Sequence, residues 1–272
     1  MLGTEVAAVL EGRAVAALGR AELDVTDASA TRAAIRAGDV VINCAAYTAV
    51  DNAEADEATA YALNATAVEN LAIACREAGA KLITVSTDYV FNGRGTRPYS
   101  ESEPRDPISA YGRTKAAGEE AAIREHPDGS YIVRTAWIYG KHGANFAQTM
   151  LNLARTRETW AVVDDQRGQP SWTYDLARQI VLLAESDVPA GIYHGTNAGE
   201  ASWFEFARAV LEEAGIDPER ITATDSSQFV RAAPRPGYSV LGHDGWRSVG
   251  LPSMRHWREA LHEAFQAGTF TI

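Results

Sequence analysis

Four short apolar runs in the first half of the chain lack the alternation of apolar and polar residues that marks a strand with one face in water. Such strands are buried on both faces, which is typical of a parallel sheet covered by helices. The runs are Val15–Leu18, Val40–Ala46, Leu82–Val85 and Tyr131–Trp137, and the helical segments between them include Ala53–Ala78 and Ser109–Arg124. The pattern predicts a Rossmann-like, doubly wound α/β domain over residues 1–140.

The second half of the chain alternates less regularly. Helices are expected over Asn145–Arg155, Tyr174–Ala184 and Trp203–Ala214, joined by stretches rich in Gly, Pro, Asp and Ser. Residues 141–272 are therefore predicted to form mainly a smaller, C-terminal substrate lobe. Two short runs, Thr159–Val163 and Gly191–His194, are candidates to extend the main sheet.

The sequence opens directly on a helix start at Met1–Glu5. In a dinucleotide-binding fold, an apolar strand and a glycine-rich turn precede this helix, and the pyrophosphate rests on its N-terminal amides. Gly3 is then the last glycine of that turn and a cofactor-binding residue. The first strand and most of the turn are accordingly expected to be missing from an N-terminally incomplete sequence.

Charge and composition narrow the classes of partner. The formal net charge of −11 argues against nonspecific binding to nucleic acid or to an anionic membrane. No apolar stretch reaches the ~20 residues that a membrane helix needs, and no secretory signal is recognisable, so a cytoplasmic location is expected. Cys44 and Cys75, the two cysteines, are expected to be packed core residues rather than a disulfide.

Tyr111 and Lys115 stand four residues apart, a spacing that places both on one face of a helix. A nearby ammonium favours the phenolate, so it is expected to lower the tyrosine pKa and to let the phenol exchange a proton with a carbonyl near neutral pH. Taken alone, the spacing fits a solvated surface pair better. The sequence motifs around this pair favour a catalytic role over a surface pair.

The stretch STDYVF, from Ser86 to Phe91, follows the buried run Leu82–Val85 directly. Thr87 and Asp88 therefore lie at the carboxyl end of a parallel strand, the edge at which α/β sheets bind ligands. A hydroxyl there can stabilise the alkoxide that forms when a hydride reaches a carbonyl. The alternative is that both residues only cap a loop.

An ordered set of motifs makes the chain similar to the dTDP-4-dehydrorhamnose reductase family of the extended short-chain dehydrogenase/reductase superfamily. The resemblance runs nearly from end to end. Its motifs are INCAAYTAVDNAE from Ile42, YALNATAVENLA from Tyr61, STDYVF from Ser86, SAYGRTKAAGE from Ser109, VRTAWIYG from Val133, NFAQTM from Asn145, VVDDQRGQP from Val162 and APRPGYSVL from Ala233.

The resemblance implies a catalytic set of three residues. Tyr111 supplies the proton, Lys115 lowers the tyrosine pKa and holds the cofactor ribose, and Thr87 orients the keto oxygen. A nicotinamide supplies the hydride. The resemblance also assigns cofactor contacts to Ala45, Ala46 and Tyr47, although packing alone would explain the alanines equally well.

For the substrate, a dTDP-linked 4-keto-deoxysugar, the resemblance indicates Asp88, Tyr111 and Thr87 together with Trp137, Arg235 and Ser239. A guanidinium suits a diphosphate, and a tryptophan face can pack against a sugar or base. Arg235 could equally be a surface charge in a proline-rich loop. For Trp137, which lies in an apolar run, packing in the core is the alternative.

The expected cofactor is NADPH, with NADH left open. The acidic residue that would bind the ribose 2′-hydroxyl of NAD is not found after Val15–Leu18, where Gly19 and Arg20 stand instead. An arginine at this place can accommodate a 2′-phosphate, and Asp24 and Val25 are expected to line the adenine side. Arg20 could also be a solvated loop residue.

No required metal is expected. Some relatives hold magnesium at a subunit contact through glutamates; Glu5 matches one such position, but Tyr174 stands where a second acidic ligand is needed. His142, His194 and His256 share no ligand spacing. A homodimer is the assembly that the resemblance implies, whereas the residues themselves do not reveal the number of subunits.

The predicted reaction is the NAD(P)H-dependent reduction of dTDP-4-dehydro-6-deoxy-L-mannose (dTDP-4-dehydrorhamnose) to dTDP-L-rhamnose. One alternative is a 4-ketoreductase of another dTDP-deoxysugar, because a few pocket side chains decide which hydroxyls are recognised. A noncatalytic regulatory subunit, similar to the beta subunit of methionine adenosyltransferase, is the other alternative.

Overall fold

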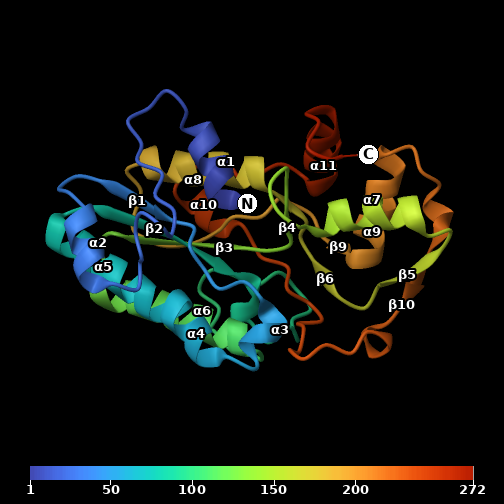
Figure 1. The fold of residues 1–272 in the computed structure, drawn as a ribbon, viewed down its shortest axis with the longest axis horizontal. Helices are drawn as coiled ribbons and strands as arrows, with labels where there is room; N and C mark the ends of the chain where they lie inside the picture. The colour runs from blue at the N-terminus through green and yellow to red at the C-terminus, as the bar shows by residue number, and fades with distance from the viewer. Residues whose placement is uncertain (272) are drawn as a thin grey trace.

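A four-stranded parallel sheet, in the order β1-β2-β3-β8, forms the centre of the larger half of the molecule (Figure 1). The computed structural model describes residues 1–271. The strands are β1 (Val40–Asn43), β2 (Lys81–Thr87), β3 (Ser130–Thr135) and β8 (Gly191–His194). All six residues of β3 are buried, as expected for a strand covered on both faces.

Helices cover both faces of this sheet (Figure 1). On one face lie α2 (Ala28–Ala34), α3 (Val50–Ala53), α4 (Glu57–Tyr61), α5 (Ala67–Ala78) and α6 (Ala110–Glu125); on the other lie α1 (Leu2–Val9), α8 (Thr173–Glu185) and α10 (Asp244–Ser248). Leu2 and Val6 of α1 pack with Ile180 of α8 and Ile83 of β2 in one apolar cluster. The predicted doubly wound α/β fold is confirmed.

The remaining elements gather around a second apolar cluster (Figure 1). They are α7 (Phe146–Thr156), α9 (Trp203–Glu213), α11 (Trp257–Gln266), β5 (Trp160–Val163) and β10 (Ile221–Thr224), with the short pairs β4 (Ile138–Tyr139) and β7 (Ser171–Trp172), β6 (Arg167–Gly168) and β9 (Ala201–Ser202). Asn145 caps α7, and Ser202 with Glu205 forms a capping box at α9. The domain division at residue 140 stays a prediction.

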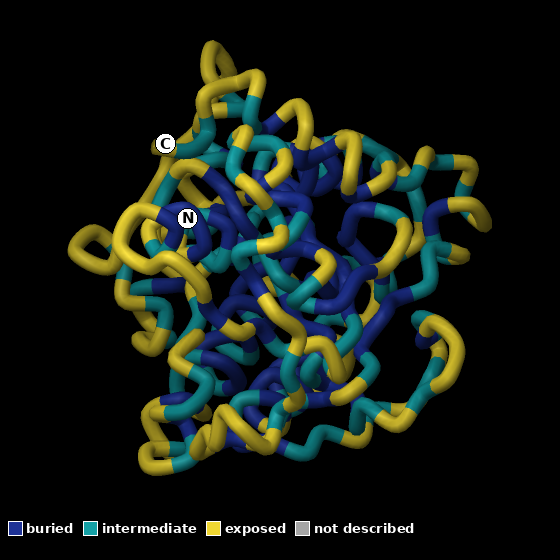
Figure 2. The backbone as a smooth tube through the Cα atoms, turned by 90° about the vertical axis from the view of Figure 1, so that its right-hand side faces the viewer, coloured by how far each residue is buried: buried dark blue, intermediate teal, exposed yellow. Residues whose placement is uncertain are grey.

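Buried backbone runs through the middle of the molecule, and the exposed stretches are peripheral loops (Figure 2). Within residues 1–271, no helix is both long and apolar enough to cross a membrane.

Two expectations about the elements are wrong. Val15–Leu18 is not a strand, and the side chains of Val15 and Leu18 are 47% and 52% exposed. A strand needs a hydrogen-bonding neighbour, and β1 is the edge strand of the sheet formed by the described residues. Thr159–Val163 does not extend the main sheet, because β5 pairs with β10 instead, whereas Gly191–His194 joins it beside β3.

The expected helical segment Ala53–Ala78 is helical except for a break at residues 54–56. The Asp56 side chain accepts a hydrogen bond from the Thr59 amide and starts a new helix there, α4. A π-helical turn, Ala62–Thr66, then leads into α5. At this turn a Cβ on Gly118 of α6 would lie 2.0 Å from the Asn64 carbonyl oxygen, so the close approach of α6 requires a glycine.

Candidate active site

The first turn of α6 lies against the turn that follows β2. Ser109 caps the helix, its hydroxyl accepting a hydrogen bond from the Gly112 amide at 3.1 Å. A Cβ on Gly112 would lie 2.3 Å from the Tyr89 carbonyl oxygen, so glycine permits this contact. Tyr111 is therefore held beside the carboxyl end of β2, where Thr87 lies.

Thr87, Asp88, Tyr111 and Ser239 converge at this end of β2. The Thr87 hydroxyl donates to Asp88 Oδ1 at 3.0 Å and accepts from the Tyr89 amide at 3.2 Å. It also interacts with the Tyr111 phenol, and the Ser239 hydroxyl interacts with the Asp88 carboxylate. Thr87, Asp88 and Ser239 are buried, and Tyr111 is half-buried. These four residues, which come from three separate stretches of the sequence, form one polar group.

The expected lowering of the Tyr111 pKa by Lys115 is not found. Burial raises the pKa of Tyr111 to about 12, opposed by the Thr87 hydroxyl and supported by the Asp88 charge. Lys115 Nζ instead donates to the Val85 carbonyl oxygen at 2.6 Å. Burial also lowers the pKa of Lys115 to about 8, while Glu119 and Cys44 act in the opposite direction. Tyr111 is thus protonated at neutral pH, which suits a proton donor.

Asp88 carries a strongly perturbed carboxylate. Burial raises its pKa to about 6, against the lowering effects of Ser239 and Thr87. Its Oδ2 atom has no hydrogen-bond partner among the described residues. A buried acceptor without a donor is costly in the folded protein and is a natural contact for a ligand hydroxyl.

The Asp88→Asn variant is expected to be more stable than the wild type at pH 7.5, by about 2 kcal/mol. Because the folded pKa is raised above the unfolded value, the wild-type contribution is complete below about pH 4 and is lost as the pH rises through 6. Chemical denaturation of both proteins at pH 4 and pH 7.5 measures the difference. An equal difference at both pH values would rule out the carboxylate charge as its cause.

The residues after β1 form a fixed backbone turn beside β2. The Ala45 amide donates to Asn43 Oδ1 at 3.0 Å. The Tyr47 amide donates to Asn64 Oδ1 at 2.8 Å, and Asn64 Nδ2 donates back to the Tyr47 carbonyl oxygen at 3.1 Å. Ala45 is exposed and Ala46 is half-buried. Small side chains on a rigid turn at the carboxyl edge leave room for a dinucleotide.

The other predicted cofactor contacts, Asp24, Arg20, Val25 and Gly3, lie outside the polar group around Tyr111. Asp24 accepts hydrogen bonds from the amide and hydroxyl of Thr26, and Arg20 lies nearby in the same exposed loop. Val25 packs against the cluster beneath α5. Gly3 lies in the first turn of α1, where an added Cβ would be 3.4 Å from Cys44 Cβ, next to the end of β1. The structure does not link Arg20 or Asp24 to the group around Tyr111.

Arg235 and Ser239 come from a segment that crosses the end of the sheet. Arg235 forms an ion pair with Asp51 at 2.8 Å, and the Ala233 amide donates to Asp51 Oδ1 at 3.1 Å. The Arg235 charge holds the pKa of the Asp51 carboxyl below its usual range. Arg235 is thus fixed close to Tyr89, and hence to the Tyr111 group.

Trp137 is separate from this group. Its ring stacks on Trp203, with centroids 3.5 Å apart, at the edge of the second apolar cluster. Its backbone has a φ of 45° between β3 and β4, a conformation that bulky residues rarely adopt. Within the described residues, the contacts of Trp137 are those of the alternative interpretation, in which its side chain packs in the core.

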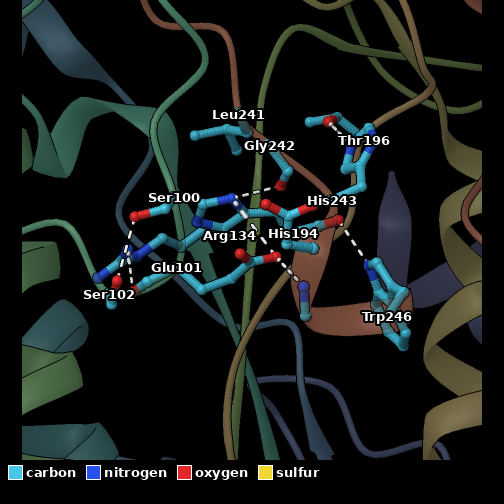
Figure 3. Close-up of polar contacts among 12 residues, drawn as sticks. Ser100, Glu101, Ser102, Arg134, His194, Thr196, Leu241, Gly242, His243 and Trp246 are labelled. Carbon is cyan, nitrogen blue, oxygen red and sulfur yellow. Dashed lines mark hydrogen bonds and ion pairs between the residues drawn. The ribbon is translucent and has the colours of Figure 1, made fainter. Parts of the chain in front are cut away.

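A polar cluster anchors the far end of the segment that carries Ser239 (Figure 3). His194 Nδ1 donates to the Gly242 carbonyl oxygen at 2.8 Å, and the indole of Trp246 donates to the His194 carbonyl oxygen at 2.8 Å. Burial lowers the pKa of His194 to about 3, so its ring is neutral. These contacts fix the segment relative to β8.

Sequence reasoning missed the residues that hold the site in place. Asn64 and Asp51 each make contacts that position a predicted site residue, and Glu119 accepts a hydrogen bond from Ser86, next to Thr87. All three lie within the quoted motifs, in the letters LN, VD and GE. A residue in a motif does not reveal its hydrogen-bond partner, however, and the partners of these residues lie elsewhere in the sequence.

No group of three or more His, Cys, Asp and Glu side chains in residues 1–271 is arranged to hold a metal ion. Glu5 lies in the first turn of α1 and lines a surface cavity with Tyr174 and Arg178. The site can also hold a nicotinamide cofactor. The small residues after β1 leave space for a ribose, and the Lys115 ammonium, which donates to the Val85 carbonyl oxygen, has further N–H groups for the ribose hydroxyls.

Comparisons with known proteins identify the family of this chain. The family model of the RmlD substrate binding domain matches residues 1–270. A dTDP-4-keto-6-deoxy-D-glucose reductase of Streptomyces niveus is 47% identical over 97% of this chain and 93% of its own length. A dTDP-4-dehydrorhamnose reductase of Streptomyces griseus is 48% identical, over 98% and 90%.

Among solved structures, a dTDP-4-dehydrorhamnose reductase of Bacillus anthracis in complex with NADP superimposes with a TM-score of 0.93. The two are 38% identical, and the match covers 98% of this chain and 95% of that one. The chain therefore belongs to the RmlD substrate binding domain family, within the extended short-chain dehydrogenase/reductase superfamily.

Proposed function

We propose that this protein reduces the 4-keto group of dTDP-4-dehydro-6-deoxy-L-mannose with NADPH, giving dTDP-L-rhamnose. The observation that supports this most is the meeting of Thr87, Asp88 and Tyr111 at the carboxyl end of β2, with Lys115 one helical turn along α6. Two hydroxyl groups converging at this edge can bind one carbonyl oxygen.

In this proposal the Thr87 hydroxyl donates to the keto oxygen and fixes its orientation. Tyr111 donates its proton to the same oxygen as negative charge develops there. The bound nicotinamide supplies the hydride. The Lys115 ammonium binds the cofactor ribose and stabilises the phenolate that remains, which offsets the burial that otherwise raises the pKa of Tyr111.

Substrate binding is assigned to Asp88, Ser239 and Arg235, with Trp137 as an additional contact. The unpaired Oδ2 atom of Asp88 accepts a sugar hydroxyl. Arg235 binds the diphosphate through the donors that Asp51 leaves free. Cofactor contacts are assigned to Gly3, Ala45, Ala46 and Tyr47, with Arg20, Asp24 and Val25 on the adenosine side.

The Arg235→Met variant is expected to raise KM for the sugar nucleotide about tenfold or more while kcat stays within about threefold. Methionine keeps the length of the side chain but removes its charge. Initial rates at saturating NADPH measure both constants, and Arg97→Met, at an exposed arginine, is the matched control. An unchanged KM would remove Arg235 from the diphosphate site.

The preference for NADPH rests on Arg20 and on the lack of an acidic residue directly after Val15–Leu18. The ratio of kcat/KM for NADPH to that for NADH tests it. A ratio well above 1 that falls in Arg20→Ala supports the assignment, whereas a preference for NADH contradicts it.

Reduction of another dTDP-linked 4-keto sugar is the second candidate. Two relatives of nearly equal identity, 47% and 48%, are named after different 4-keto sugars. A panel of dTDP-4-keto sugars offered to the purified protein discriminates the two, and the highest kcat/KM is expected with dTDP-4-dehydrorhamnose. A noncatalytic role receives no comparable support, because these relatives are reductases by name.

A further inference from the structure

A buried ion pair between α6 and β3 lies behind the candidate active site. The side chains of Glu119 and Arg134 are each 1% exposed, and two hydrogen bonds of 2.9 and 2.7 Å join them. The guanidinium binds both carboxylate oxygens, which fixes the geometry of the pair. Two charges are costly to remove from water, and such a pair often adds little net stability. Stability alone therefore does not explain why the Glu119–Arg134 pair is buried at this place.

Three residues of α6, each one turn from the next, contact neighbouring positions of β2. In order along α6, the Tyr111 phenol interacts with the Thr87 hydroxyl, Lys115 Nζ donates to the Val85 carbonyl oxygen at 2.6 Å, and Glu119 Oε1 accepts from the Ser86 hydroxyl at 2.5 Å. Side chains four residues apart lie on one face of a helix. Together these contacts fix how α6 sits along β2.

We propose that Glu119 is a positioning residue for Lys115. Arg134 and Ser86 hold its carboxylate one helical turn beyond the lysine, where its charge favours the protonated ammonium. On a helix, the Cβ atoms of such a pair are about 6 Å apart, close enough for a strong effect in a buried site. The inference deepens the proposed function, in which the charged Lys115 stabilises the Tyr111 phenolate.

The surroundings of Lys115 make Glu119 the charge that matters. Burial lowers the pKa of Lys115 to about 8, and Glu119 is the larger of the two groups that raise it. The other is Cys44, after β1, and burial raises the pKa of that thiol to about 11, so it is neutral at physiological pH. Without Glu119, burial would leave much of Lys115 uncharged near neutral pH.

Further contacts prevent the pair from moving away. Arg134 Nη1 donates to the Glu101 carbonyl oxygen at 3.5 Å, within the cluster of Figure 3. Arg105 Nη1 donates to Glu119 Oε2 at 3.3 Å from the more exposed side. The carboxylate is thus held from three directions, by β2, by β3 and by the loop before α6.

The experiment is a direct titration of Lys115 by NMR. The chain has three lysines, Lys81, Lys115 and Lys141, so labelling lysine Cε with carbon-13 gives few signals, and Lys115→Met assigns one of them. In Glu119→Gln the midpoint for Lys115 is expected to fall from about 8 to about 7. Glu120→Gln, the same change at the adjacent exposed residue, is expected to leave it in place.

If Glu119→Gln fails to fold because it leaves Arg134 buried without a partner, the double variant Glu119→Gln, Arg134→Met removes both charges. The same downward shift is expected there. A Lys115 midpoint equal to that of the wild type in either folded protein overturns the proposal. The titration needs no substrate, so its failure is distinguishable from a failure of the proposed reductase function.

Discussion

Replacement of Tyr111 with phenylalanine is expected to lower kcat about 1,000-fold while the dissociation constant of NADPH changes less than about threefold. Phenylalanine fills the same space but has no proton to give to the keto oxygen. The Thr87 hydroxyl remains, so substrate binding and part of the alkoxide stabilisation survive. Single-turnover kinetics and fluorescence titration with NADPH measure the two quantities.

Tyr131→Phe provides the matched control. It removes one phenol from the opposite end of the sheet, where the Tyr131 hydroxyl donates to the Val188 carbonyl oxygen at 2.8 Å. Its kcat is expected to stay close to that of the wild type. A Tyr111→Phe enzyme that retains the wild-type rate would remove Tyr111 as the proton donor.

The second large effect is expected for Lys115→Met. Losing the ammonium removes both the ribose contact and the charge that stabilises the phenolate, so kcat/KM for NADPH should fall at least about 100-fold. Unlike Tyr111→Phe, this variant should bind NADPH more weakly. The comparison of the two variants separates proton donation from cofactor binding.

Unfolding does not explain the expected loss in Lys115→Met. Burial depresses the folded pKa of Lys115 to about 8, below the unfolded value, so the charged lysine lowers stability at neutral pH. Methionine removes that cost, and the Tm should be equal or higher. Lys141→Met, at an exposed lysine, is the control. Wild-type kcat/KM in Lys115→Met, or a loss that follows only from a lower Tm, would contradict the assignment.

Much of the main sheet could be predicted because its strands and helices carry local signals. Leu82–Val85 and Tyr131–Trp137 are mostly apolar, and Ser109 precedes a helix that it caps. A local sequence pattern does not predict a strand correctly where strand formation depends on a pairing partner elsewhere in the chain. Val15–Leu18 has the composition of a strand, but a strand forms only where it pairs with a neighbour, and among the described residues this segment pairs with none.

The sequence predicted the residues that react, but it did not predict the residues that hold them in position. Tyr111 and Lys115 share a helix face that spacing alone reveals. The Tyr111 pKa was predicted in the wrong direction, because burial cannot be read from the motif and it outweighs the lowering effect of the Thr87 hydroxyl. Arg235 and Asp51 are 184 residues apart, so no local sequence pattern predicts their ion pair.

In the proposed reaction, a hydride reaches the carbonyl carbon of the sugar while Thr87 and Tyr111 bind the carbonyl oxygen. Incubating the protein with dTDP-4-dehydrorhamnose and NADPH deuterated at the transferable C4 position tests it most directly, with NMR of the product as the measurement. The expected product is dTDP-L-rhamnose with deuterium at C4 of the sugar, together with equimolar NADP⁺. Cofactor oxidation without deuterium at that carbon, or an unreacted keto sugar alongside a folded protein that binds NADPH, would contradict it.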